Sequence, residues 1–273
     1  MTANIFEIKR FAINDGDGIR TTVFFKGCPL RCLWCHNPEG LLSKTQNAFY
    51  AHKCVGCGEC KKEGFSEENC LGQARTIYGK EITVDELLPI LLEDKDFYES
   101  SGGGVTLSGG ECLVQADFCA ELLRLLKQNG ISTAVDTCGY ITKEALDKVI
   151  PYTDVFLYDL KAYDEDVHLR CTAHSNKIIL ENLSYLDSLG KSIEIRIPFV
   201  PDFNDTQIEK IARFLMPMKS ISKIRVLPYH NYADSKYEAL DIKNTLPNRI
   251  PTDQEVEKAK QTLSEITKIK VIS

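Results

Sequence analysis

Short apolar runs that alternate with amphipathic segments constrain the fold of this chain more than any other sequence feature. Runs of this length and β-branched content predict buried strands, and the segments between them predict helices. Strands that alternate with helices at this spacing pair in parallel through right-handed crossovers. The six predicted strands are Thr22–Phe25, Gly104–Leu107, Ser132–Asp136, Asp154–Leu160, Ile193–Phe199 and Lys223–Leu227.

Start and stop signals delimit several of the predicted helices. Gly130 and Gly190 stand where the helices after the second and fourth strands are expected to end in a left-handed residue. Periodicity alone is compatible with an open doubly wound sheet and with part of a barrel. Capping-box spacing precedes three further helices, at Thr83 with Glu86, Thr206 with Glu209, and Thr252 with Glu255.

The composition limits the classes of function. With 273 residues, 43% of them hydrophobic, the chain can bury one large core or a core plus a small insert. A net charge of -6 without a long basic run argues against nucleic-acid binding. The charged N-terminus lacks the apolar region of a signal peptide, and no apolar stretch approaches the roughly 20 residues that span a membrane. Eleven cysteines, an odd number crowded at short spacings, favour cytoplasmic metal chemistry over a disulfide scaffold.

A loop of three cysteines follows the first predicted strand, at Cys28, Cys32 and Cys35. A closed zinc site needs four ligands, and His36 is a poor fourth ligand because adjacent loop residues rarely reach one tetrahedral ion. Three buried structural cysteines are disfavoured because the loop is polar. The spacing favours a [4Fe–4S] cluster with one iron open to a small chelating molecule.

This spacing, with Trp34 before the last cysteine, resembles the radical S-adenosylmethionine (SAM) superfamily. The resemblance implies that SAM chelates the open iron and that Trp34 lies in the cofactor site. It also implies that an electron from the cluster cleaves SAM into methionine and a 5′-deoxyadenosyl radical, which then abstracts a hydrogen atom.

Polar groups also follow the carboxyl ends of five further strands, where sites form in parallel α/β folds. Singly, each has an ordinary explanation as a turn, a helix cap, a surface charge or a structural histidine. At equivalent positions downstream of the cysteine loop, they together favour a SAM site. They are Gly109, Gly110 and Glu111 in "SGGE", Asp136 and Thr137 in "DTCG", Asp159 and Lys161 in "DLK", Arg196 in "EIRIP", and His230 in "LPYH".

A longer series of motifs resembles the glycyl radical enzyme activating enzymes, the pyruvate formate-lyase activase family. The motifs are "DGDGIRTTVFFKGCPLRCLWCHNPEG", "GGGVTLSGGECLVQ", "AVDTCGY", "YDLKAYD", "RIPFVPDFND" and "IRVLPYHNYADSKY". The resemblance implies an α/β fold with a partial, TIM-like (β/α)6 barrel. It further implies an oxidoreductase that removes hydrogen from one glycine of a large partner enzyme.

The resemblance also implies a role for each matching position. The resemblance implies a monovalent cation beside the SAM carboxylate, which is consistent with electrostatics because aspartates that face a bound carboxylate would otherwise repel it. The implied roles are cluster ligation for Cys28, Cys32 and Cys35, the SAM amino group for Gly109, Gly110 and Glu111, the cation for Asp136, Thr137 and Asp159, and SAM contacts for Lys161, Arg196 and His230.

The segment from Asp15 to Gly18 resembles the family's "DGPG" loop, which lies near the substrate glycine. This resemblance implies that Asp15 and Gly16 belong to the catalytic site. Asp17 replaces the usual proline of that motif. We expect Gly16 and Gly18 to form a side-chain-poor track for a peptide backbone, so that valine at either position spares iron and SAM binding.

Residues 44–80 interrupt the strand–helix alternation and predict an insert between two parts of the barrel, 1–43 and 81–273. The insert has little apolar periodicity, so metal is expected to hold it together. Its cysteine spacing resembles the front of a ferredoxin motif and predicts a second, auxiliary [4Fe–4S] cluster. A zinc knuckle with His52 and a metal-free insert are the alternatives. The predicted ligands are Cys54, Cys57, Cys60 and Cys70.

The four remaining cysteines are predicted to pack in the core. They are Cys112, Cys119, Cys138 and Cys171, and the resemblance places Cys112 and Cys138 at positions that are commonly proline and serine or asparagine.

The leading hypothesis is an activating enzyme that acts on another protein. A radical SAM enzyme for a small molecule is the alternative within enzymology. An electron-transfer protein would not need the ordered SAM residues. Expected partners are a large glycyl radical enzyme of open identity and an electron donor of the flavodoxin or ferredoxin type, with the chain itself monomeric.

Overall fold

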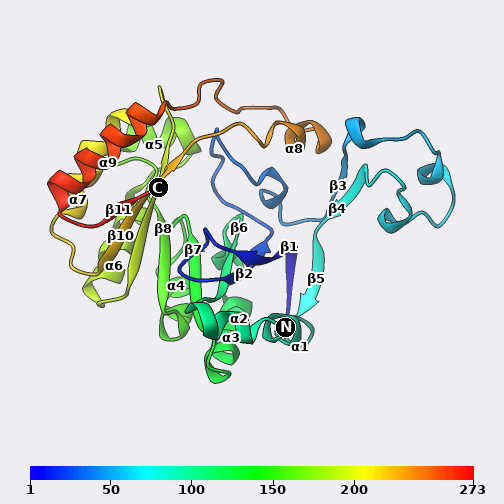
Figure 1. Cartoon of the computed structure of the whole chain (residues 1–273), viewed down its shortest axis with the longest axis horizontal. Helices are drawn as coiled ribbons and strands as arrows, with labels where there is room; N and C mark the ends of the chain where they lie inside the picture. The colour runs from blue at the N-terminus through cyan, green and yellow to red at the C-terminus, as the bar shows by residue number, and fades with distance from the viewer.

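An open nine-stranded sheet forms the centre of the computed structural model, which describes residues 1–273 (Figure 1). The strand order is β11-β10-β9-β8-β7-β6-β2-β1-β5. Neighbours from β2 to β11 pair in parallel, whereas β1 is antiparallel to both β2 and β5. The strands are β1 Thr2–Ala12, β2 Arg20–Phe25, β5 Lys80–Thr83, β6 Gly104–Gly109, β7 Ser132–Thr137, β8 Val155–Asp159, β9 Ile193–Phe199, β10 Ile221–Pro228 and β11 Val271–Ile272.

The six predicted parallel strands are confirmed as β2 and β6 to β10, with ends that shift by a few residues. The five strands β2 and β6 to β9 consist largely of buried residues, because their apolar side chains are covered on both faces, whereas β10 near the edge of the sheet is only partly buried. Helical segments follow the strands in order, so the predicted partial (β/α)6 barrel is also confirmed. The barrel stays open because β5 and β11 are free edges of the sheet.

The longer helices lie on the outer side of the sheet (Figure 1). Their buried residues recur on one face, such as Leu122, Leu123 and Leu126 of α3, and pack against the strands. No helix combines the length and the apolar content needed to cross a bilayer. The helices are α1 Val84–Leu92, α2 Lys95–Ser101, α3 Ala116–Gln128, α4 Lys143–Val149, α5 Glu165–Thr172, α6 Lys177–Ser188, α7 Ile208–Leu215, α8 Asp234–Ala239 and α9 Asp253–Thr267.

Two of the three predicted capping boxes are confirmed, at the starts of α1 and α9. The box predicted at Thr206 is wrong, because a 3-10 turn over Asp205–Gln207 precedes α7. Buried Asn204 starts this turn: its side chain accepts from Val200 N at 2.8 Å and its carbonyl accepts from Gln207 N at 2.9 Å.

The predicted helix ends at Gly130 and Gly190 are confirmed. Their backbones have φ values of +76° and +67°, the left-handed conformation that glycine adopts without strain. Each follows the last turn of its helix, α3 or α6, by two residues.

A cysteine-rich lobe, Gln46–Tyr78, projects from the barrel (Figure 1). Its base is an antiparallel pair of strands, β3 Gln46–Phe49 and β4 Arg75–Tyr78. From Ala51 to Gln73 no residue is buried, and three short 3-10 turns replace regular structure. Ala48 and Tyr50 at the base pack against Ala239 and Leu240 at the end of α8. The domain division at residues 44 and 80 stays a prediction.

Candidate active site

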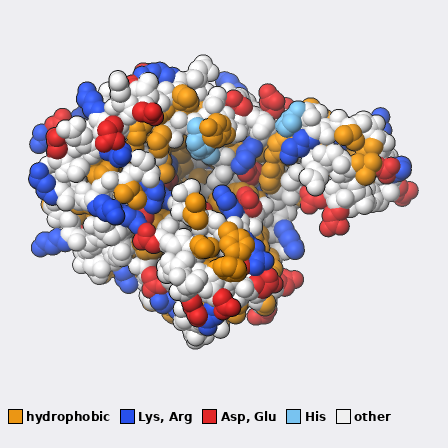
Figure 2. Space-filling view, viewed as in Figure 1, with side chains coloured by type: hydrophobic (Ala, Val, Ile, Leu, Met, Phe, Trp, Pro, Cys, Tyr) orange, Lys and Arg blue, Asp and Glu red, His pale blue; other side chains and the backbone are white.

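A cavity of about 520 Å³ opens at the carboxyl ends of the parallel strands. Figure 2 shows the corresponding face hollowed at its centre, with histidine side chains at the edge of the hollow. The volume lies in the range of pockets that hold drug-sized molecules. Most of the predicted site residues line it: Asp15, Cys28, Cys32, Trp34, Cys35, Gly109, Gly110, Asp136, Thr137, Asp159, Lys161, Arg196 and His230.

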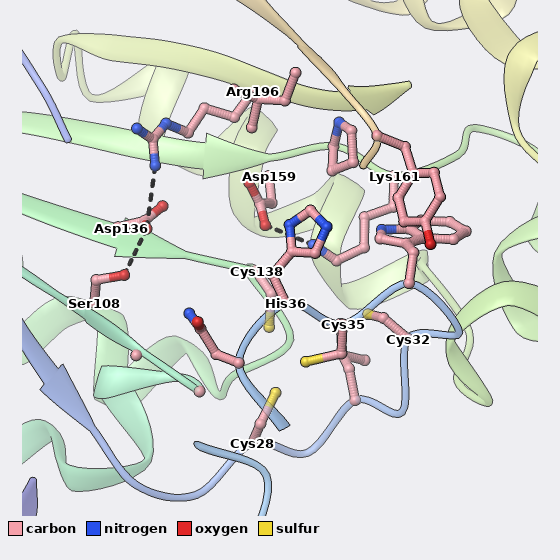
Figure 3. Close-up of a pocket in the computed structure, with 18 of the residues that line it drawn as sticks. Cys28, Cys32, Cys35, His36, Ser108, Asp136, Cys138, Asp159, Lys161 and Arg196 are labelled. Carbon is pink, nitrogen blue, oxygen red and sulfur yellow. Dashed lines mark hydrogen bonds and ion pairs between the residues drawn. The ribbon is translucent and has the colours of Figure 1, made fainter. Parts of the chain in front are cut away.

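Backbone hydrogen bonds fix the cysteine loop that follows β2. Gly27 N donates to Gly40 O at 2.8 Å, which closes the start of the loop. Further along, Arg31 N donates to Thr172 O and Leu33 N to Cys171 O, both at 2.9 Å. The loop is therefore anchored to the end of α5, and its three cysteines reach the cavity from one side (Figure 3).

The donor set of this loop fits an iron–sulfur cluster. Cys28, Cys32 and Cys35 are free, partly buried thiols that line one cavity. Cysteine thiolates are the usual ligands of such clusters, and three of them leave one iron without a protein ligand. His36, the fourth ligand in the zinc alternative, is engaged elsewhere, since its Nε2 contacts His230 O at 2.6 Å. This arrangement disfavours the zinc site.

Two ion pairs join the polar groups at the strand ends (Figure 3). Arg196 Nη1 lies 3.2 Å from Asp136 Oδ2, which also accepts from Ser108 Oγ at 2.6 Å. Lys161 Nζ lies 2.5 Å from Asp159 Oδ2. Groups from β6, β7, β8 and β9 thus meet in the same cavity, as the strand order predicts.

Burial and pairing set the charges of these groups. Burial raises the pKa of Asp136 to about 6, although the charge of Arg196 opposes the shift. Burial by itself lowers the pKa of Lys161, but the Asp159 carboxylate and the nearby cysteine thiolates together outweigh burial, and the net pKa is raised. Lys161 is therefore a fixed positive charge beside the cysteine loop.

Aromatic rings form another wall of the cavity. Trp34 is buried, and its ring centroid lies 6.4 Å from that of Phe203. The rings of His36 and His230 stack with centroids 4.1 Å apart, and Tyr232 stacks on His230 at 4.3 Å. Burial lowers the pKa of both histidines, so both rings are neutral near pH 7.

Glu111 is not among the residues that line the cavity. Its buried carboxylate accepts hydrogen bonds from Leu113 N at 3.1 Å, Thr137 Oγ1 at 2.9 Å and Cys138 N at 2.8 Å. Glu111 therefore ties the end of β6 to the end of β7. A contact between Glu111 and the amino group of SAM stays a prediction, and this placement does not support it.

The loop Asn14–Ile19, here called the DGDG loop, connects β1 to β2, and its residues Asn14 and Asp15 line the cavity. Arg196 Nη2 donates to Asn14 O, and Thr22 Oγ1 donates to Asp15 Oδ2 at 2.9 Å. Asp17, at the position of the family's proline, forms an ion pair with Lys223 on β10. The DGDG loop is thus fixed to both sides of the barrel.

The glycines of the DGDG loop serve the packing of the loop itself. Gly16 has φ of +116° and faces the side chain of Arg20 rather than the cavity. Gly18 has φ of +71°, and a Cβ there would lie 2.4 Å from Gly103 N. The expectation that valine at Gly18 spares iron and SAM binding stays a prediction, and this contact argues against it, because the backbone of Gly103 leaves no space for a side chain.

Cys138 is the cavity residue that sequence reasoning assigned to the wrong environment. It was predicted to pack in the core, but it lines the cavity and faces Cys28 (Figure 3). Its place directly after Thr137 at the end of β7 was the available signal. Cys112, Cys119 and Cys171 are buried and outside the cavity, as predicted.

The cysteines of the projecting lobe lie apart from this cavity. Cys54, Cys57 and Cys60 are exposed, whereas Cys70 is half-buried and its sulfur accepts from Ala74 N at 3.3 Å. No three Cys, His, Asp or Glu side chains are gathered as closely as a single bound metal ion requires. Whether the lobe binds a cluster stays a prediction.

Comparisons with known proteins agree with this geometry. Residues 22–215 match the radical SAM superfamily. The choline trimethylamine-lyase activating enzyme of Oleidesulfovibrio alaskensis is 39% identical over 269 residues, covering 87% of each chain. The trans-4-hydroxy-L-proline dehydratase activating enzyme of Clostridioides difficile is 39% identical over 268 residues, covering 88% of each.

Solved structures give the same answer. The crystal structure of a domain of a pyruvate formate-lyase activating enzyme from Bacteroides vulgatus aligns with a TM-score of 0.53 at 29% identity, covering 62% of this chain and 98% of that one. Family match, relatives and fold all confirm the resemblance seen in the motifs. The chain is a member of the radical SAM superfamily and, within it, belongs to the glycyl radical enzyme activating enzymes.

Proposed function

We propose that this chain cleaves SAM reductively at a [4Fe–4S] cluster held by Cys28, Cys32 and Cys35, and that the resulting radical takes a hydrogen atom from a glycine of a partner enzyme. One observation carries the proposal: three cysteines and the polar ends of four neighbouring strands line one cavity. When bound, the cluster supplies the electron and an open iron for the amine and carboxylate of SAM.

The chain's own residues would hold SAM in place. The paired charges of Asp136 with Arg196 and Asp159 with Lys161 offer donors and acceptors for the polar ends of the molecule. Gly109 and Gly110 line the cavity without side chains, so backbone groups can approach a ligand closely. Trp34 and His230 supply aromatic surface for the adenine end.

A monovalent cation at Asp136, Thr137 and Asp159 is part of the proposal. All three residues line the cavity, and oxygen ligands suit such ions. The basic partners of both aspartates reduce the need for an added cation. A stimulation of SAM cleavage by potassium or sodium salts would therefore be modest.

The resemblance implies that the DGDG loop, which includes Asp15, lies near the substrate glycine. Asp15 lines the cavity, and its carboxylate accepts from Thr22 Oγ1 while lying 3.7 Å from Arg196 Nη2. A peptide that reached the cavity would meet Asp15 and the DGDG loop that Asp17 and Lys223 hold in place. Asp15 is therefore the residue of the loop that we assign to substrate positioning.

We propose that the partner of this chain is a glycyl radical enzyme of one of the types that its relatives activate. Choline trimethylamine-lyase and trans-4-hydroxy-L-proline dehydratase are the first two to test, since their activating enzymes are each 39% identical to it. A flavodoxin- or ferredoxin-type donor would supply the electron, and a monomer would act on each partner.

The test uses the anaerobically reconstituted full-length chain with SAM, dithionite and either candidate partner. We expect methionine and 5′-deoxyadenosine to form in equal amounts and a carbon-centred doublet to appear by electron paramagnetic resonance (EPR). A partner labelled with α-deuterated glycine should pass deuterium into 5′-deoxyadenosine. The Cys28→Ala variant should lose all these signals, whereas Cys171→Ala, whose thiol lies outside the cavity, should keep them.

Two outcomes would contradict the proposal. SAM cleavage that survives in Cys28→Ala would remove the cluster from the cysteine loop. Deuterium that reaches 5′-deoxyadenosine from a labelled small metabolite, and never from labelled glycine, would favour the small-molecule enzyme instead.

A further inference from the structure

We propose that Tyr237 and Lys236 of α8 are positioning residues that hold Cys35, the third cysteine of the loop, where the cluster needs it. Their side chains bind the backbone that follows Cys35, and neither residue lines the cavity. This inference rests on the cluster site proposed above. It gives a role to the two residues that end the motif "IRVLPYHNYADSKY", to which the sequence assigned none.

The backbone that follows the third cysteine lacks partners of its own. Cys35 N donates to Cys32 O at 3.2 Å, which closes a turn within the loop. Cys35 and His36 lie outside helices and strands, and no backbone N–H donates to the carbonyl of either residue. An unpaired carbonyl away from water costs free energy. The two carbonyls therefore depend on side chains for their hydrogen bonds.

Neighbouring residues of α8 supply both donors. Tyr237 Oη donates to Cys35 O at 3.1 Å, and Lys236 Nζ donates to His36 O at 3.1 Å. These bonds join residues that are 202 and 200 positions apart in the chain. The carboxyl half of the cysteine loop is thus attached to a helix from the last part of the barrel.

Both donors are themselves held in place. Tyr237 is buried, which restricts its ring to one position. Lys236 also forms an ion pair with the buried side chain of Glu39, and charged partners give the stronger hydrogen bonds. Glu39 belongs to the 3-10 turn Pro38–Gly40 that follows the cysteine loop. Lys236 therefore joins α8 to the loop at two points.

The side chain of His36 is fixed from the same part of the chain. Its Nε2 contacts His230 O at 2.6 Å, and its ring stacks on that of His230. Residues 230–237 thus hold the ring of His36 and the carbonyls of both Cys35 and His36. A fixed backbone fixes the direction of Cβ and leaves Sγ only the staggered positions around it. These contacts therefore decide where the sulfur of Cys35 lies in the cavity (Figure 3).

The first experiment compares two tyrosines that make the same kind of bond. Tyr237 and Tyr98 are each 2% exposed, and Tyr98 Oη donates to Leu91 O at 3.0 Å, outside the cavity. Tyr237→Phe and Tyr98→Phe should lose similar stability in urea. Iron release to the chelator ferrozine, from the reconstituted full-length chain, should be about fivefold faster in Tyr237→Phe, the change that one lost hydrogen bond typically produces. Tyr98→Phe should release iron at the wild-type rate.

A second readout needs no cluster. Hydrogen–deuterium exchange of the metal-free full-length chain follows the amides of Gly40 and Leu41, which donate to Asn37 O at 2.9 Å and to Pro38 O at 3.2 Å. Exchange in this peptide should be about fivefold faster in Tyr237→Phe and unchanged in Tyr98→Phe. Lys236→Met should accelerate it further, because buried Glu39 loses its counter-charge. Lys236→Arg, which keeps the charge and a donor, should restore slow exchange.

The outcomes separate this inference from the proposed function. If Tyr237→Phe matches Tyr98→Phe in both iron release and exchange, Tyr237 is an ordinary core residue and the inference is overturned. Exchange that stays slow in Lys236→Met would likewise remove Lys236 from the positioning role. A wild-type chain that binds no cluster would contradict the proposed function instead, while the exchange of the metal-free chain would still decide whether α8 holds the loop.

Discussion

At the scale of single residues, close backbone approach decides several positions that look functional in the sequence. Gly18 is fixed by its contact with Gly103, and Gly109 by the backbone of Phe25, whose N would lie 2.2 Å from an added Cβ. Both sites need a residue without a side chain, whatever binds in the cavity. Glycines in a motif near an active site can therefore be required by the packing of the loop, even where they do not contact the substrate.

This argument predicts different costs for two neighbouring substitutions. Gly18→Ala adds a clash with Gly103 to the strain of its positive φ and should lower the free energy of unfolding by about 3 kcal/mol. Gly102→Ala is the control, because Gly102 also has positive φ, +69°, but no atom lies within 4 Å of an added Cβ. It should cost about 1 kcal/mol.

Urea unfolding of the two variants and the wild type, each with the same iron content, measures the difference. Equal midpoints for the two alanine variants would mean that the DGDG loop can move away from Gly103, and the packing explanation would then be wrong.

Most of the site residues that the sequence predicted line the cavity, because parallel strands bring their carboxyl ends to one edge of the sheet. The sequence could not predict in which direction each side chain points. Glu111 lies in a motif at the expected edge of the sheet, but its carboxylate turns toward Thr137, and Cys138, the residue after Thr137, faces Cys28 (Figure 3). Both orientations depend on hydrogen bonds between β6 and β7, which spacing along one chain does not reveal.

At the scale of elements, local hydrogen bonds determine where helices begin. Thr252 caps α9: its Oγ1 accepts from Glu255 N at 3.3 Å, while the Glu255 carboxylate accepts from Thr252 N at 2.9 Å. The same sequence spacing at Thr206 gives no box, because buried Asn204 has already started a turn. A capping motif thus predicts a helix start only where no buried side chain upstream organises the chain first.

These two threonines give a direct comparison. Thr252→Ala should lower the free energy of unfolding by about 1 kcal/mol, because α9 loses a donor–acceptor pair at its first turn. Thr206→Ala should be nearly neutral, since Thr206 is exposed and caps no helix. Thermal unfolding of both variants checks this. A destabilised Thr206→Ala would indicate that Thr206 does cap α7, contrary to the structure.

At the scale of the whole molecule, the sequence predicted the strands of the parallel part of the sheet but not the remaining strands. The first strand, β1, intersperses polar and charged residues among its apolar ones and is partly exposed, so it lacks the continuous apolar run that marks the buried strands. The last strand, β11, has only two residues. Both join the sheet through backbone pairing with a neighbour, β1 with β2 and β11 with β10. Such pairing leaves a weak signal in residue type.

The lobe and the barrel should hold their metal independently. Reconstituted wild-type protein is expected to bind about eight irons, and Cys54→Ala about four, with SAM cleavage retained. Cys28→Ala should also bind about four irons but lose SAM cleavage. Iron and zinc analysis of the three proteins measures this. Unchanged iron in Cys54→Ala would refute the auxiliary cluster, and loss of zinc from that variant would identify a zinc knuckle.

The chain enters and leaves the lobe at adjacent points. Gln46 pairs with Tyr78, and Thr45 Oγ1 donates to Gly79 O at 3.2 Å. Because the two ends of the lobe lie side by side, a segment of any length can replace it without moving the barrel. The part of the gene that encodes the lobe is therefore an exchangeable cassette. Recombination could therefore lengthen, shorten or delete the cassette in a single event, while the barrel keeps its chemistry under separate selection.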